Sequence, residues 1–274
     1  MARENLVTLT GPVIGKQIRY NDDRNPIKGT IILATCTRGL GTLNKGVEPR
    51  YRSYQIPVVS RNERIIEKLE NVGINDVVYI KGVVYTRNMI NRHICENCGS
   101  IEDKPVTRAF VVPIDFIILK DHIEAETAKE FTKAHAEFSN EVNIIGNICV
   151  GPKRIGASRQ SPLEYQLAVS RTYRIAEDGE ETKTDYPWVV CYGQSTYMDE
   201  EVLQVSSQIM VNGFLKTREF LRHFECSECG EKFSIKCQAM EITPYHVEYL
   251  RNCNIPETED PDSEEVAGNS YEYE

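Results

Sequence analysis

The feature that most constrains this chain is an internal repeat centred on two Cys-x-x-Cys-Gly motifs. "CENCG" stands at 95–99 and "CSECG" at 226–230, and a Gly-x-x-x-Thr-Arg run precedes each motif at the same distance. The matched positions are 131 residues apart, as Cys95 and Cys226 show. Because 274 residues suffice for two ordinary domains, the repeat predicts two copies of one fold.

The repeat extends into segments that favour strands. "NLVTLTGPVIG" (5–15) aligns with "NEVNIIGNICVG" (140–151), and "YQIPVVSR" (54–61) is paired with "YQLAVSR" (165–171) as the third strand of each half. These segments alternate apolar and polar residues or are rich in β-branched residues, as strands are. Each half is expected to hold about five strands, with a short helix after the third.

This order predicts a mainly β protein with two tandem OB folds, the five-stranded Greek-key barrel that binds oligonucleotides. A glycine inside the fourth strand of each half fits the tight bend of a small barrel. The cysteine motifs would be zinc-knuckle insertions between strands four and five. We expect a first barrel over 1–119, a linking helix over 120–138, a second barrel over 139–253 and a disordered acidic tail over 254–274.

The acidic charge of the chain is concentrated in this tail. The net charge is −9, and residues 254–274 contain eight acidic residues and no basic one. Such a composition is typical of disordered segments. Residues 1–119 carry more basic than acidic residues, so the overall charge does not exclude a nucleic-acid partner.

The nine cysteines favour metal binding over a disulfide framework. The first residues lack the basic and then apolar pattern of a secretory signal, and no apolar run approaches the ~20 residues that span a bilayer. We therefore expect a cytoplasmic protein that makes no membrane contact. In a reducing compartment Cys-x-x-Cys pairs indicate a zinc site.

A structural zinc needs four ligands, and each motif supplies two thiolates. A shared site would use Cys95, Cys98, Cys226 and Cys229 from both halves. Two separate sites are an alternative, in which His223 and Cys237 complete the second one. Reduced thiols without metal are a third interpretation.

The second half resembles the bacterial single-stranded DNA-binding protein family over most of 139–245. The resemblance is carried by "NEVNIIGNI", "YQLAVSRTY", "DYPWVVCYG" and "SQIMVNGFLKTR". The first half resembles the family less closely, through "NLVTLTGPV", "YQIPVVSR" and "DVVYIKGVVYTR". Two barrels followed by an acidic tail is an arrangement found in some family members.

The resemblance implies stacking of bases on aromatic side chains. Tyr173, Tyr192 and Phe220 fall on such positions, while Trp188 is shifted by two residues and keeps the same strand face. Stacking on a ring contributes about 1–3 kcal/mol per base, and Lys and Arg follow the phosphates. The basic candidates are Arg171, Lys216 and Arg218 in the second half and Arg50, Arg52, Arg61, Lys81, Arg87 and Arg92 in the first.

These observations predict a non-enzymatic protein that coats single-stranded DNA with little sequence preference. In the family an acidic tail recruits replication or repair proteins, and Tyr271 and Tyr273 are the candidate partner-binding residues here. Three alternatives remain: a subunit of a replication or transfer assembly, an RNA-binding protein, and a zinc-dependent nuclease. The family's four-barrel unit suggests a homodimer, although a monomer is equally consistent with the sequence.

Overall fold

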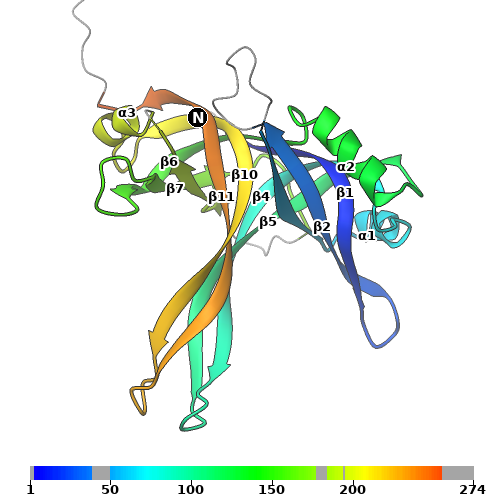
Figure 1. Cartoon of the computed structure of the whole chain (residues 1–274), viewed down its shortest axis with the longest axis horizontal. Coiled ribbons are helices and arrows are strands. Elements are labelled where there is room, and N and C mark those ends of the chain that lie inside the picture. The colour runs from blue at the N-terminus through cyan, green and yellow to red at the C-terminus, as the bar shows by residue number, and fades with distance from the viewer. Residues whose placement is uncertain (1–2, 39–49, 177–183, 194, 255–274) are drawn as a thin grey trace, which may run out of the picture.

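The computed structural model describes residues 3–38, 50–176, 184–193 and 195–254, and these are mainly β (Figure 1). The predicted tandem OB-fold architecture is confirmed. The first barrel consists of β1 (Glu4–Tyr20), β2 (Pro26–Arg38), β3 (Tyr51–Ser60), α1 (Glu63–Glu70), β4 (Val77–Ile94) and β5 (Ile101–Lys120). The second follows α2 (Ala125–Ala134) and consists of β6 (Asn140–Arg154), β7 (Leu163–Ser170), β8 (Thr184–Asp185), β9 (Trp188–Cys191), α3 (Ser195–Val202), β10 (Gln208–Glu225) and β11 (Lys232–Arg251).

The strands form one continuous sheet that closes twice. Its order is β2-β3-β5-β4-β1-β6-β10-β11-β9-β7-β8, and the additional pairings β1–β2 and β6–β7 close the two barrels. Alternate residues of β1 and β6, such as Val7 and Leu9 or Val142 and Ile144, are fully buried in the core. The period of two in the sequence therefore places one face of each strand inside its barrel.

Gly82 and Gly213 lie where β4 and β10 bend closely over their neighbouring strands. A Cβ atom on Gly82 would lie 2.5 Å from the Val112 carbonyl oxygen, and one on Gly213 would lie 2.3 Å from that of Thr243. Both distances are too short for any side chain. Each glycine thus permits the close approach of backbones that the barrel requires.

The strand registers correct the predicted pairing of "YQIPVVSR" with "YQLAVSR". β3 runs parallel to β5 through Val58 and Val111, and the corresponding parallel pair in the second barrel joins Val189 of β9 to Ile242 of β11. "YQLAVSR" forms β7, which lies between β6 and β9 as β2 lies between β1 and β3. It is therefore the second strand of its barrel, and β9 is the third.

The two barrels are joined by antiparallel pairing of β1 with β6, from Glu4 opposite Ile145 to Leu9 opposite Asn140. A buried asparagine on each strand reinforces the joint. Asn5 exchanges two hydrogen bonds of 2.9 Å with the backbone of Val84, and Asn140 does the same with Leu215 at 2.8 and 2.9 Å. The joint is therefore nearly twofold symmetric.

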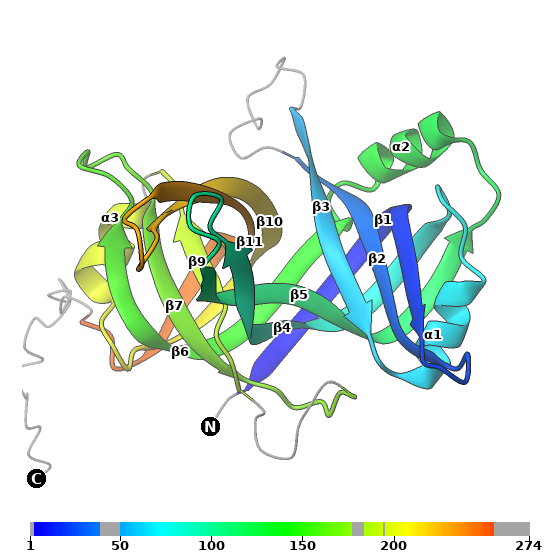
Figure 2. The same ribbon diagram turned by 90° about the horizontal axis from the view of Figure 1, so that it is seen from below.

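Two long hairpins, β4–β5 and β10–β11, extend together away from the barrels (Figure 1). Seen from below, they lie between the barrels (Figure 2). Their ladders continue to the pairs Ile94–Ile101 and Glu225–Lys232, next to the cysteine motifs. The stalk, as we call these two hairpins beyond the barrels, thus carries both motifs at its tip.

None of the helices in the described part of the chain is long and apolar enough to cross a bilayer.

Candidate metal centre and nucleic-acid interface

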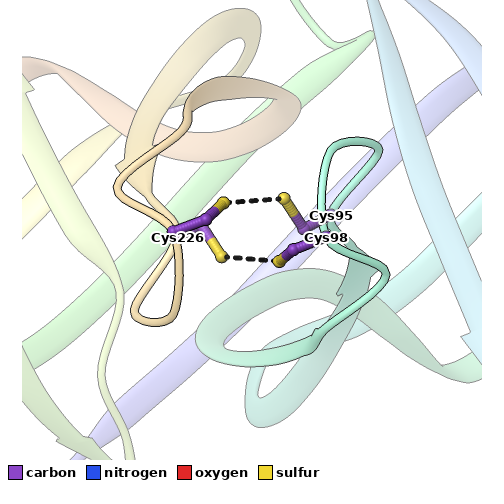
Figure 3. A group of neighbouring side chains, drawn as sticks. Cys95, Cys98 and Cys226 are labelled. Carbon is purple, nitrogen blue, oxygen red and sulfur yellow. Dashed lines mark hydrogen bonds between the residues drawn. The ribbon is translucent and has the colours of Figure 1, made fainter.

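The four motif cysteines meet at the tip of the stalk. The Sγ atoms of Cys95 and Cys229 are 3.7 Å apart and those of Cys98 and Cys226 are 3.6 Å apart. Figure 3 shows the side chains converging from the two hairpin turns. All four sulfur atoms lie within 4.8 Å of one another. The two halves of the repeat therefore form one shared cluster.

The sulfur positions fit a tetrahedral metal ion. Four thiolates at a Zn–S distance of about 2.3 Å lie about 3.8 Å from one another. A disulfide would instead need a sulfur separation of about 2.05 Å. Cys95 and Cys226 are buried while Cys98 and Cys229 are exposed, so the cluster is held by the stalk and remains accessible from one side.

Polar and aromatic contacts across the stalk hold the two turns together. The Glu102 carboxylate accepts hydrogen bonds from the Ser227 backbone N–H and hydroxyl, at 2.7 and 2.6 Å. Lys104 and these two Ser227 donors hold the pKa of Glu102 down at about 2. The rings of His93 and Phe233 stack with centroids 4.0 Å apart. The turn that carries Cys226 and Cys229 is thus fixed by side chains of the other hairpin.

Hydrogen bonding favours the thiolate at Cys98 and Cys226, whereas the neighbouring Cys98 and Cys226 sulfurs help to raise the pKa of Cys229 to about 11. The hydroxyl and the backbone of Ser100 lower the pKa of Cys98 to about 6. The same hydroxyl lies 3.1 Å from the Cys226 sulfur and lowers the pKa of that thiol too. Thiolates are the form of cysteine that binds metal.

The residues proposed for a separate second site lie outside this cluster. His223 Nδ1 is 2.7 Å from the Ser234 hydroxyl, and Cys237 is a buried residue paired with Phe220 in the β10–β11 ladder. Among the described residues, the cysteine motifs form one group that could hold a metal ion, and neither His223 nor Cys237 belongs to it. The geometry therefore favours the shared arrangement over two separate sites.

A basic cleft lies on the first barrel, between the β1–β2 turn and the base of the first hairpin. It has a volume of about 900 Å³, and none of the described residues that line it is acidic. Its polar and basic lining comprises Arg19, Lys28, Arg61, Arg87 and Asn88, with Ile27, Met89, Ile90 and Pro105 as the apolar part. Cleft walls of one charge sign concentrate an oppositely charged ligand.

Mutual repulsion in this basic cleft is visible at Lys28. Burial lowers the pKa of this lysine, and the charges of Arg19, Arg61, Arg87 and Arg108 lower it further. Positive charges so close together without acidic lining are typical of a site for phosphate groups. Of the sequence candidates, Arg61 and Arg87 line this cleft.

The other basic candidates of the first barrel lie elsewhere. Lys81 faces the second barrel, with Nζ 6.0 Å from the centre of the Tyr173 ring. Arg92 lies on the stalk and pairs with Asp103 at 2.9 Å. Arg50 and Arg52 are exposed at the start of β3. The structure therefore does not gather these four residues into the basic cleft.

The second barrel carries the aromatic candidates. Tyr173 is 38% exposed and Tyr192 is 40% exposed, while Trp188 and Phe220 are partly covered. Val189 and Cys191 belong to the core, so Trp188 and Tyr192 share the opposite face of β9, as the spacing of two predicts. Accessible rings on one barrel can stack on bases.

The predicted cations of β10 share a buried carboxylate. Glu241 is 2% exposed and contacts Lys216 Nζ at 3.3 Å and Arg218 Nε at 2.7 Å. Lys216 also lies over the Tyr192 ring, 4.4 Å from its centre. This group therefore has less net positive charge than the two cations suggest.

The prediction that Arg171 contacts a phosphate group is wrong. Its side chain is 1% exposed and forms an ion pair of 2.6 Å with Asp185, which is equally buried. The guanidinium also lies 5.2 Å from the centre of the Tyr85 ring of the first barrel. Burial and pairing keep Arg171 away from solvent, where a nucleic acid would bind.

Sequence reasoning missed several residues of these surfaces. Arg19 and Lys28 line the basic cleft from β1 and β2, and Arg108 of β5 adds its charge nearby; no local pattern connects them. Tyr186 is 45% exposed beside β9. Its place in "DYPWVVCYG", one residue before Pro187 and two before Trp188, is the signal that could have identified it.

The fold and these surfaces define a protein with two tandem OB-fold barrels linked by a cysteine cluster. Residues 139–240 match the sequence model of the single-strand binding protein family. The second barrel is thus similar in sequence to the single-strand binding protein family. Comparison with curated proteins finds no match to the sequence.

Two solved structures resemble the whole chain. One is the wild-type single-stranded DNA binding protein from Thermus aquaticus, with 13% identity and a TM-score of 0.55, covering 91% of this chain and 95% of that chain. The other is a deletion mutant of that Thermus aquaticus protein, with 14% identity and a TM-score of 0.54, covering 94% of this chain and 100% of that chain. At this identity the similarity establishes the tandem fold.

Proposed function

We propose that this chain is a non-enzymatic protein that coats single-stranded DNA with little sequence preference, in the bacterial cytosol or nucleoid. The observation that carries the proposal is the family match of the second barrel, whose exposed rings can stack on bases. The basic cleft supplies the phosphate contacts on the first barrel. DNA replication, recombination, repair or transfer exposes such strands.

The division of labour between the barrels supports binding without sequence readout. Every base has a π face, so stacking tolerates any sequence. Phosphate groups are the same at every nucleotide and carry no sequence information. A single strand that contacted both barrels would use the rings of one and the charge of the other.

We also propose that the cysteine cluster holds one structural zinc ion. Cys95, Cys98, Cys226 and Cys229 would be its ligands, which leaves no position open for a substrate. A closed four-thiolate site is typical of structural rather than catalytic zinc. The ion would fix the two hairpins together and so maintain the stalk.

The tail is proposed to act in partner recruitment. Tyr271 and Tyr273, as well as residues 255–274 generally, lie outside the described residues. Their acidic composition would also let the tail compete with DNA for the basic cleft, which would make the affinity for DNA more sensitive to salt.

The test is quenching of Trp188 and tyrosine fluorescence on titration with a poly-thymidine oligonucleotide at low and high salt. We expect strong quenching that weakens with salt, and tighter binding for a variant that ends at residue 254. A matched ribo-oligonucleotide separates DNA from RNA preference. Feeble binding even at low salt would overturn the proposal in favour of an assembly subunit, and metal-dependent cleavage of the oligonucleotide would favour a nuclease.

A further inference from the structure

The two barrels meet at two junctions that the repeat makes equivalent. In the first barrel Tyr54 pairs with Thr35, and in the second Asp185 pairs with Val169 at the matching place. If the chain were a symmetric dimer, both junctions would contain the same side chains. Here they differ, and the difference determines which junction is open.

One junction is filled by protein. Asp185 pairs with Arg171, and its other carboxylate oxygen accepts a hydrogen bond of 2.9 Å from the Thr86 backbone N–H in the first barrel. The Thr86 hydroxyl in turn accepts a hydrogen bond of 2.8 Å from the Tyr186 backbone N–H. These contacts bind β8 to β4 and close the junction.

The other junction contains a cleft of about 300 Å³. Residues of both barrels line it, with Thr37, Arg38, Arg52 and Tyr54 from the first and Tyr192, Phe214, Lys216 and Thr243 from the second. This volume is at the lower end of the range for small-molecule sites. The cleft therefore has room for about one nucleotide.

The walls of this cleft combine rings with cations. The rings of Tyr54 and Phe214 lie 5.5 Å apart across the junction, and Tyr192 is 40% exposed at its edge. Arg52 is exposed, and Lys216 lies over the Tyr192 ring while its charge is partly offset by Glu241 at 3.3 Å. Aromatic faces flanked by arginine and lysine are the chemistry that recognises a base together with its phosphate.

Two polar atoms in the cleft have no partner among the described residues. The Thr243 hydroxyl is buried, in a residue that is 3% exposed, and makes no hydrogen bond. The Arg38 Nε is also buried without an acceptor, while the Nη1 of the same guanidinium donates a hydrogen bond of 3.4 Å to Glu137. Because burying such groups unsatisfied costs about 1–3 kcal/mol each, they indicate a ligand that completes their hydrogen bonds.

We propose that the open junction binds one nucleotide of a single strand as that strand crosses from one barrel to the other. The base would lie against the exposed ring of Tyr192, with the largely buried rings of Tyr54 and Phe214 beneath it and the Thr243 hydroxyl nearby. Arg38 and Arg52 would hold the phosphate. The proposal rests on the single-strand binding function proposed above and fixes where the strand passes.

The first test compares affinities for a thymidine oligonucleotide. Thr243→Val keeps the shape of the side chain but removes the hydroxyl, and we expect affinity to fall about 5-fold. For Arg38→Gln we expect a salt dependence reduced by about one phosphate contact. Arg159→Gln is the matched control, because Arg159 is exposed and lies over the Tyr197 ring outside the cleft. This control should bind as the parent chain does.

The second test is photo-crosslinking of the unmodified chain to an oligonucleotide containing 5-iododeoxyuridine. We expect crosslinked peptides that include Tyr54 or Tyr192, and none from the Tyr85 region of the closed junction. Tight oligonucleotide binding with unchanged cleft variants and no crosslink in the cleft would overturn this inference and leave the proposed function intact. Absence of any binding by the parent chain would overturn both.

Discussion

The two barrels share one backbone and differ in the chemistry of matched surface positions. Arg61 follows β3 in the first barrel where Tyr192 follows β9 in the second, and Met89 stands where Phe220 stands. At these two positions the first barrel therefore presents Arg and Met where the second presents aromatic rings. Duplication within one chain has let the two copies differ in surface chemistry, which identical subunits could not do.

The largest expected effect comes from opening the cysteine cluster. The double substitution Cys95→Ser and Cys226→Ser should abolish zinc binding and lower stability by about 4 kcal/mol, since a cross-link between distant parts of a chain restricts the unfolded state. Metal content and urea unfolding measure the two effects. Cys253→Ser, outside the cluster, should change neither, and an equal zinc content in the double variant would refute the shared site.

The joint between the barrels can be tested from both sides. Asn5→Ala and Asn140→Ala each leave a backbone N–H and C=O unpaired in a buried place, so each should lower stability by about 2–3 kcal/mol. Asn140 should have the larger effect because it also donates to the Thr35 hydroxyl at 3.0 Å. Urea unfolding at fixed pH gives both values, and a negligible loss in either variant would contradict the near symmetry of the joint.

The surface difference predicts two distinct binding defects. Tyr192→Ala should weaken binding of a thymidine oligonucleotide by about 1–2 kcal/mol while the salt dependence stays the same. Arg61→Ala should reduce the slope of log affinity against log salt by about 0.7. Titrations at several salt concentrations separate the two defects, and identical slopes for both variants would remove the proposed division between the barrels.

The smallest effect concerns the pH response of the basic cleft. Because the pKa of Lys28 is lowered in the folded state, the unfolded chain binds more protons between that lowered pKa and the ordinary value near 10.5. Stability should therefore rise with pH in this window. Lys28→Arg removes the titration, so subtracting its unfolding free energies from those of the parent isolates the effect. A difference that falls with rising pH would contradict the crowding of positive charge.

The sequence was sufficient to predict the fold, offered the shared cysteine cluster as one of three arrangements, and revealed only part of the surfaces. Two copies of a Cys-x-x-Cys-Gly motif at a constant offset indicate a duplicated fold. The pairing of the two copies brings the cysteines together. The positions of basic and aromatic residues within each strand could also be predicted from the sequence. Tyr173 and Tyr192 are accessible rings in the structure, although their contact with DNA remains a prediction.

The failures come from partners that are distant in sequence. In the sequence Arg171 resembles a surface cation, but in the fold it forms a buried ion pair with Asp185 of the two-residue strand β8. "YQLAVSR" resembles "YQIPVVSR" in letters, yet only the registers reveal that it is a second strand. The charge cluster around Lys28 is assembled from several strands. The hydrophobic periodicity of a strand gives no information about which residues of distant strands it will contact.

The contacts across the stalk have an evolutionary consequence. In a dimer of identical chains every contact occurs twice, by symmetry. Glu102 meets Ser227, whereas the residue that matches Glu102 in the other hairpin is Phe233, and that ring stacks on His93. Each of these contacts exists once. Covalent fusion of the two halves therefore makes the two hairpins permanently different from each other. A mutation at one of these contacts can be compensated only by a change in the single residue that it touches in the other hairpin.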